Sequence, residues 1–219
     1  MWNSQVIIML LEGIRDTLYM TLASTLFGYI IGLPMGIVLT VTDKDGIRPN
    51  AAVYNVLDVI SNLLRSIPFI ILLIVLIPFT RFVVGRSYGS TATIVPLTIA
   101  AAPYIARMVE SSLKEVDAGV IEAARSMGAS DFQIVTKVML VEARTSLIVG
   151  ATISLGTILG YSAMAGTVGG GGLGDIAIRY GYTRWQTDIM VVTVVLLVIL
   201  FQIFQTIGMK IANRLDRRK

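Results

Sequence analysis

Residues 17–41, TLYMTLASTLFGYIIGLPMGIVLTV, run for 25 positions without a charged side chain. About 20 apolar residues in a helix cross the hydrocarbon core of a bilayer, so this stretch is long enough to span a membrane. Other charge-free runs cover residues 87–106, 145–174 and 189–209. Residues 51–80 contain Asp58 and Arg65 but continue as the apolar SIPFIILLIVLIPFT.

These runs predict an all-α integral membrane protein with one domain over residues 1–219. We expect five transmembrane helices, at about residues 17–41, 52–80, 88–108, 145–168 and 187–211. Before the first of them, residues 2–14 are expected to form a short interfacial helix with Trp2 as a headgroup anchor.

The composition supports a lipid environment and excludes several chemistries. Of the 219 residues, 55% are hydrophobic and 15% charged, whereas a soluble domain is about 45–50% apolar and about 25% charged. The chain has no Cys and no His, which rules out disulfides, Cys/His zinc sites and Ser-His or Cys-His nucleophiles. We expect no cofactor, no metal and no catalytic site, so the chain is not itself an enzyme.

The distribution of basic residues predicts the orientation. With the N-terminus outside and the C-terminus inside, 12 of the 18 Lys and Arg lie on the cytoplasmic side and five outside. Cytoplasmic loops are enriched in Lys and Arg, so we expect an N-out, C-in protein. The net charge of +4 is therefore a marker of topology, and no nucleic-acid partner is expected.

Several features lie inside the expected spans. Gly28, Gly32 and Gly36 fall on one helix face, where another helix can approach closely. Asp58 and Arg65 also share a face, with either a structural role at the interface or a role in the transport path. The Gly-rich stretch 169–174 lacks the strand of a nucleotide-binding fold, and we expect a tight turn or re-entrant segment on the outer side.

The fourth expected span is rich in Gly, Ala and Ser, with bulky exceptions at Tyr161 and Met164. A helix coated with small residues either packs tightly or lines a narrow path. Tyr161 and Met164 are accordingly candidates for a gate, and ordinary helix packing is the alternative.

The loop at residues 109–144, expected to be cytoplasmic, carries clear helix signals. Asp117 is a good N-cap for a short helix that ends before Gly128, and Ser130 with Gln133 forms a capping box for a second helix. The first helix has an apolar edge that water does not require. It is expected to dock into a groove on another protein or to lie on the membrane surface.

This loop resembles the permease subunits of ABC importers. Glu122-Ala123-Ala124, then Gly128, then Val138 and Leu140 follow the signature E-A-A-x3-G-x9-I-x-L-P, with Val141 in place of the usual Pro. Four further segments are similar to the methionine-importer (MetI-like) subfamily: LRSIPFIILL at 64–73, PFTR at 78–81, APYIARMVE at 102–110 and GYSAMAGTVGGGGLGDIAIRYGY at 160–182. The resemblance covers nearly the whole chain.

The resemblance implies a function and a set of partners. The protein would be the permease subunit of an ATP-driven importer of methionine, in the bacterial inner membrane. Its short helix at about 118–128 would be a coupling helix between spans 3 and 4. Its partners would be two copies of an ABC ATPase subunit, a second copy of itself, a periplasmic or lipid-anchored substrate-binding protein and the membrane lipid.

The residues expected to dock the ATPase are Val120, Ile121, Glu122, Ala123, Ala124, Met127 and Gly128. Three other interpretations stay open at this point. The substrate could be another small amino acid or solute, the chain could work as an ATP-independent secondary transporter or channel, or it could be a structural membrane scaffold.

Overall fold

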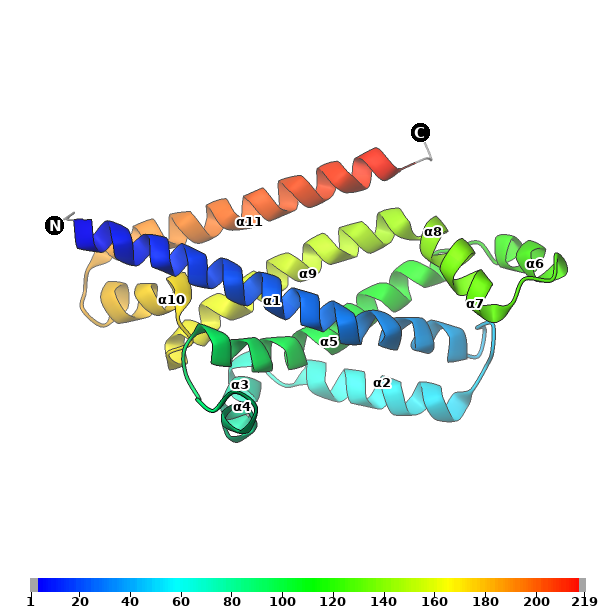
Figure 1. Ribbon diagram of the computed structural model, residues 1–219, viewed down its shortest axis with the longest axis horizontal. Coiled ribbons are helices and arrows are strands. Elements are labelled where there is room, and N and C mark those ends of the chain that lie inside the picture. The colour runs from blue at the N-terminus through cyan, green and yellow to red at the C-terminus, as the bar shows by residue number, and fades with distance from the viewer. Residues whose placement is uncertain (1–3, 217–219) are drawn as a thin grey trace.

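The chain folds into an elongated bundle of helices (Figure 1). The computed structural model describes residues 4–216, and every regular element within that range is helical. The longer helices are α1 (Ser4–Thr42), α2 (Ala51–Ser66), α5 (Ser90–Lys114), α9 (Arg144–Ala165) and α11 (Thr187–Leu215). The shorter ones are α3 (Phe69–Val75), α4 (Ile77–Val84), α6 (Ala118–Ser126), α7 (Asp131–Gln133), α8 (Leu140–Glu142) and α10 (Gly172–Ile176). Ile134–Met139 and Ala177–Tyr182 are π-helical, and Gly166–Val168 is a 3₁₀ turn.

The expected all-α membrane architecture is confirmed. Within residues 4–216, four segments are long and apolar enough to cross a bilayer: α1, α5, the stretch Arg144–Tyr182 that contains α9, and α11. The bent pair of α2 and α3 makes a fifth if the two helices are counted as one span. One detail differs from the sequence-based expectation, because α1 runs unbroken from Ser4 and leaves no separate interfacial helix before residue 17. Trp2 lies outside the described residues.

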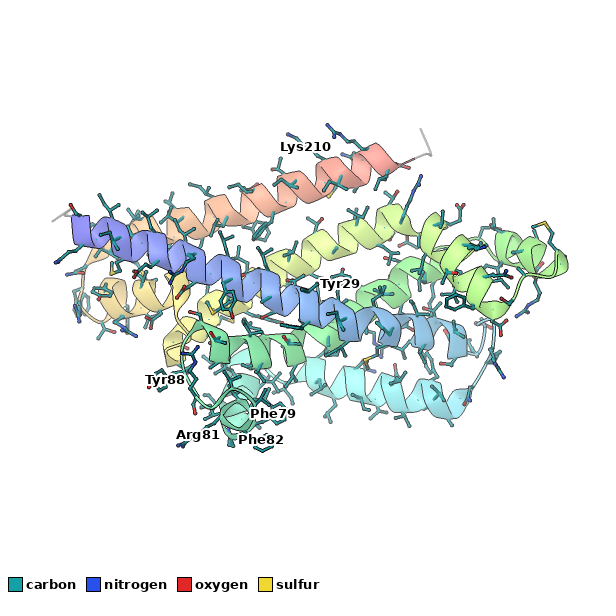
Figure 2. The ribbon with its side chains drawn as sticks, in the orientation of Figure 1. Tyr29, Phe79, Arg81, Phe82, Tyr88 and Lys210 are labelled. Atoms are coloured by element: carbon teal, nitrogen blue, oxygen red, sulfur yellow. The ribbon has the colours of Figure 1, made fainter. Side chains whose placement is uncertain are left out.

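The expected span over residues 52–80 is sharply broken at Pro68, where the sequence predicts a bend. The axes of α2 and α3 meet at 102°, around Ile67 and Pro68. Proline disfavours the helical conformation of the residue before it, and Ile67 is extended, with φ −80° and ψ 124°. The bend turns α3 and α4 across the end of α2, so Phe79, Arg81 and Phe82 project from the side of the bundle (Figure 2).

Helix α1 packs most extensively on α5, and small residues make this contact possible. A Cβ atom added to Gly32 would lie 2.6 Å from the carbonyl oxygen of Ala102, and one added to Gly36 would meet the carbonyl of Ala106. Gly28, Gly32 and Gly36 are all buried on this face. The glycine spacing therefore predicts this helix contact correctly.

The helices differ strongly in how much of their surface the bundle covers. The most apolar part of α5 is 61% buried, whereas that of α11 is 11% buried. Apolar side chains that would be costly in water therefore stay exposed along α11, as expected for a surface that lipid covers. Those exposed by half or more are Val191, Val198 and Ile207.

The glycine-rich stretch after α9 is a tight turn tied to α1 and α5. Gly169 accepts a hydrogen bond from the backbone N–H of Gly89 at 2.9 Å, and the N–H of Leu173 donates to Oγ1 of Thr17 at 2.8 Å. Gly169 and Gly171 have φ of 78° and 83°, a region that favours glycine. The predicted tight turn is confirmed, and it places α10 beside the N-terminal part of α1 (Figure 1).

Candidate partner-docking helix and gate

Helix α6 lies at the end of the bundle opposite α10 and is delimited by local signals (Figure 1). Asp117 is its N-cap, with Oδ1 accepting from the N–H of Gly119 at 2.7 Å. At the other end Gly128 has φ +81°, and its N–H donates to the carbonyl of Arg125 at 2.9 Å. The sequence predicts both ends of this helix correctly.

One face of α6 is fixed to the rest of the protein. Ala124 is 5% exposed, and Ile121 packs beside it against the hydrophobic core. Nη2 of Arg125 donates to the carbonyl of Ile47, in the loop between α1 and α2, at 2.6 Å. Two of the seven expected docking residues, Ile121 and Ala124, therefore face the body of the protein, where they hold α6 in place.

The opposite face of α6 is open and partly apolar. Met127 is 82% exposed and Val120 is 42% exposed, and Glu122 and Ala123 are exposed between them. Phe132 on α7 is 77% exposed and lies inside the confirmed Ser130–Gln133 capping box. Phe132 is not among the residues expected to dock the ATPase, although a Phe inside a capping box on a polar loop is itself a signal of a contact surface. A short helix with a rigid back and exposed Met, Val and Ala is suited to fitting a groove on a partner.

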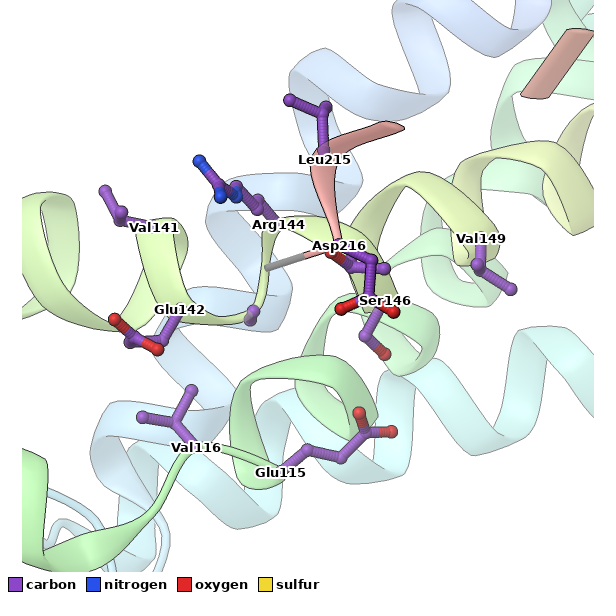
Figure 3. Close-up of a pocket in the computed structure, with 11 residues that line it drawn as sticks. Glu115, Val116, Val141, Glu142, Arg144, Ser146, Val149, Leu215 and Asp216 are labelled. Atoms are coloured by element: carbon purple, nitrogen blue, oxygen red, sulfur yellow. The ribbon is translucent and has the colours of Figure 1, made fainter. Parts of the chain in front are cut away.

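A pocket of about 320 Å³ lies where the ends of α5, α8, α9 and α11 meet (Figure 3). Glu115, Glu142 and Asp216 line it together with Arg144. Within residues 4–216, no three Asp or Glu side chains lie close enough together to hold a metal ion.

A cluster of charges joins α2 to α5, and no pattern in the sequence predicts it. The Arg107 guanidinium forms an ion pair with Asp58 on α2 and a 2.7 Å ion pair with Glu110. Glu110 is 5% exposed. Asp58 takes its partner from another helix, and Arg65, expected on the same face of α2, is exposed. No short-range pattern links positions 58 and 107, so the pairing could not be read from the sequence.

Lys114 extends this cluster to the end of α1. Its Nζ lies 2.8 Å from Oε1 of Glu110 and 2.6 Å from Oδ2 of Asp43. The hydrogen bond from Lys114 is the largest of the effects that lower the pKa of Asp43 below its usual value. Asp43 is therefore a carboxylate at neutral pH, and the contact is fully formed there.

The two candidate gate residues lie near the C-terminal end of α9. Tyr161 stacks on Phe69 of α3, with ring centroids 4.6 Å apart and an interplanar angle of 4°. Met164 follows about one turn later and is 50% exposed. Ile153 and Gly160 are exposed and Thr157 is half-buried, at helical spacing on the same side of α9, so Met164 projects from a stripe of α9 that this chain leaves largely uncovered.

The fold and these sites define a multi-pass, all-helical membrane protein with a short exposed helix held at one end of the bundle. The chain belongs to the family described as binding-protein-dependent transport system inner membrane component, whose profile matches residues 19–219. It is 48% identical to the probable D-methionine transport system permease protein MetI of Vibrio cholerae serotype O1, over 96% of this chain and 93% of that one. It is 54% identical to the D-methionine transport system permease protein MetI of Escherichia coli K12, over 72% of this chain and 73% of that one.

Solved structures with the same fold include the inward-facing MetNI methionine ABC transporter. That chain is 50% identical, with a TM-score of 0.97 over 99% of this chain and 100% of the other. A chain of an amino acid ABC transporter crystallised with histidines has a TM-score of 0.78 over 96% of this chain and 95% of the other, at 20% identity, and this second likeness concerns the fold alone.

Proposed function

We propose that this chain is the membrane-spanning permease subunit of an ATP-driven ABC importer of methionine. The relatives named as D-methionine permeases support the substrate, and the similarity to the MetNI transporter supports the assembly. In this proposal ATP is hydrolysed in a separate subunit, and this chain provides the path across the membrane.

The observation that carries the proposal is the two-sided construction of α6. Its back is fixed by Ala124 and by the bond from Arg125 to Ile47, whereas Val120, Ala123 and Met127 are open to a partner. A helix held in this way can be pushed without being detached. An ATPase groove that binds α6 differently in its open and closed states would transmit the energy of ATP to the permease.

The orientation follows from the charge distribution and from α6. The end of the bundle that carries α6 would face the cytoplasm, where the ATPase resides, and the end that carries α10 would face outward. The partners are then two ATPase subunits docked on the α6 helices of two copies of this chain. A periplasmic or lipid-anchored substrate-binding protein would deliver methionine to the outer end.

The gate in this proposal is Met164, with Tyr161 behind it. Met164 projects from the uncovered stripe of α9, and Tyr161 is held in place by the ring of Phe69. Two copies of the chain that met along this stripe would bring two Met164 side chains towards a common axis. Apolar side chains at that position would close the path to a zwitterion until the two copies separate.

Reconstitution tests the proposal directly. Proteoliposomes are prepared with this chain, its ATPase and its binding protein, and uptake of labelled methionine is followed with ATP, without ATP and without the ATPase. The expected result is uptake only in the complete system with ATP. Uptake that persisted without the ATPase would favour an ATP-independent transporter, and ATP-driven uptake of another small amino acid or solute instead of methionine would change the substrate alone.

A further inference from the structure

The charge cluster around Arg107 connects α2 to α5. The guanidinium binds Asp58 and the side chain of Asn62 on α2, the latter at 3.1 Å. It also holds Glu110 on its own helix, α5. Glu110 in turn accepts a 3.4 Å hydrogen bond from the hydroxyl of Tyr54, near the start of α2.

The same cluster reaches the loop that anchors α6. Lys114 joins Glu110 to Asp43, which directly follows α1. Four residues further along, the carbonyl of Ile47 accepts the bond from Arg125 of α6. Polar contacts, joined by the chain between Asp43 and Ile47, therefore lead from α6 through the α1–α2 loop and α5 to the middle of α2.

Burial makes the ion pair between Arg107 and Glu110 rigid. The side chain of Arg107 is 15% exposed and that of Glu110 is 6% exposed, so water replaces a lost partner poorly. By contrast, the nearby ion pair of Lys44 and Asp45 is more than 80% exposed on both sides, with its charged atoms 3.7 Å apart. Exposed pairs of that kind contribute little. Arg107 presents a planar fork to two carboxylates on different helices, which fixes their relative orientation as well as their distance.

Helix α2 leads from this cluster directly to the candidate gate. About seven residues beyond Asn62, after the 102° bend, the chain reaches Phe69, whose ring lies against Tyr161 of α9. A displacement of α2 along or across its axis would therefore move the surface on which Tyr161 rests.

We propose that Arg107 is a positioning residue that locks α2 to α5 and to the α6 anchor, so that α2 acts as a lever between the docking helix and the Phe69–Tyr161 contact. This inference rests on the proposed function, since it assigns the route by which movement of α6 would reach the gate. In it α2 and α6 move as one body, and the Pro68 bend carries that movement across to α9.

The test compares Asp58→Asn with Asp45→Asn in the reconstituted complete transporter. Both substitutions turn a carboxylate into an amide, but only Asp58 contacts Arg107. For Asp58→Asn we expect the number of ATP molecules hydrolysed per methionine transported to rise about fivefold or more, in the range of typical coupling energies. For Asp45→Asn we expect the wild-type ratio. A wild-type ratio in Asp58→Asn would overturn the inference.

A spectroscopic measurement keeps the proposal testable if Asp58→Asn does not assemble. The chain lacks Cys, so spin labels can be placed at Val56→Cys on α2 and Lys137→Cys beside α6, both at exposed positions. In the wild-type background the distance between the labels should be the same without nucleotide and with trapped ATP. A change in this distance between the two states would contradict the proposal that α2 and α6 move as one body.

These outcomes are separable from a failure of the proposed function. If the wild-type system takes up no methionine with ATP, the proposed function fails before the variants are compared. If the wild type transports but Asp58→Asn couples normally, only the role of Arg107 fails. Arg107→Lys keeps the charge but loses the fork, and it should fall between the wild type and Asp58→Asn.

Discussion

The ring of Phe69 lies flat against the ring of Tyr161, with centroids 4.6 Å apart, although the two residues belong to α3 and α9. Phe69 is the first residue of α3, directly after the Pro68 bend, and is 7% exposed. A stack of this kind adds about 0.5–1.5 kcal/mol beyond the burial of its surface. It fixes the face of α9 from which Met164 projects.

Replacing Met164 tests the gate. Met164→Ala shortens the side chain that is proposed to close the path, and it should raise methionine leakage through the transporter severalfold when ATP is absent. The measurement is efflux from preloaded proteoliposomes without nucleotide. Met209→Ala, on the exposed surface of α11, is the matched control and should leave efflux at the wild-type rate. Equal efflux from all three proteins would remove Met164 from the gate.

A substitution at Gly128 tests whether coupling depends on the left-handed backbone conformation at the end of α6. Its φ of +81° penalises a β-branched residue by about 1–2 kcal/mol, while an added Cβ meets nothing within 4 Å. Gly128→Val should therefore change the end of α6 through the backbone alone and uncouple ATP hydrolysis from uptake. The ATPase rate and the uptake rate of the same proteoliposomes measure this.

Gly85 supplies the matched control for Gly128. It has φ +79° and equally open surroundings, but it lies at the end of α4, away from α6. Gly85→Val should lower thermal stability by a similar amount and keep normal coupling. If Gly85→Val uncoupled as strongly as Gly128→Val, the effect would reflect general destabilisation.

The contact between α1 and α5 predicts that alanine substitutions at two glycines differ in their effect on protein stability. An added Cβ at Gly32 would sit 2.6 Å from the backbone oxygen of Ala102, whereas one at Gly160 meets nothing within 4 Å. Gly32→Ala should destabilise the protein by about 1–3 kcal/mol through overpacking. Gly160→Ala should be neutral or stabilising by up to about 1 kcal/mol, because Ala is the better helix former. Thermal unfolding in detergent distinguishes the two, and equal melting temperatures would argue against the close contact.

The ion pair between Asp43 and Lys114 makes the connection between α1 and α5 depend on pH. Its pKa is lowered in the folded protein, chiefly by the hydrogen bond from Lys114. The stability it adds is therefore present above the pKa of the unfolded chain, about 3.9, and is lost as the pH falls through the lower folded value. Asp43→Asn should melt below the wild type at pH 7, and the difference should shrink below about pH 4. A difference that stayed constant down to pH 3 would assign it to packing instead.

The sequence predicts those parts of the structure that depend on neighbouring residues. Asp117 and Gly128 delimit α6 because an N-cap and a left-handed C′ glycine act within one turn of the chain. The glycines of α1 give its packing face because their spacing of four residues repeats once per turn. The bend after α2 follows from Pro68, although its angle of 102° depends on the packing of α3.

The remaining features depend on contacts between distant segments. Asp58 pairs with Arg107, because α5 packs against α2 at that level. In the same way, nothing near Tyr161 in the sequence indicates that Phe69 covers it. The burial of Ala124 also cannot be predicted from the sequence. Which face of a nine-residue helix is buried depends on the segments that pack against it. The sequence therefore predicts the ends of α6 but not the contacts that hold it to the bundle.

Cysteine cross-linking between α6 and the ATPase is the most direct test of whether α6 docks on that subunit. Since the chain has no Cys, single substitutions at Ala123 and Ala124 can be compared in the assembled transporter, with a cysteine scan along the ATPase groove. If α6 docks on the ATPase, Ala123→Cys should cross-link rapidly, because Ala123 is exposed. Ala124→Cys should cross-link little, because Ala124 is 5% exposed. A fully active transporter in which Ala123→Cys never cross-links to the ATPase, and stays equally reactive to a soluble maleimide with and without it, would contradict the account.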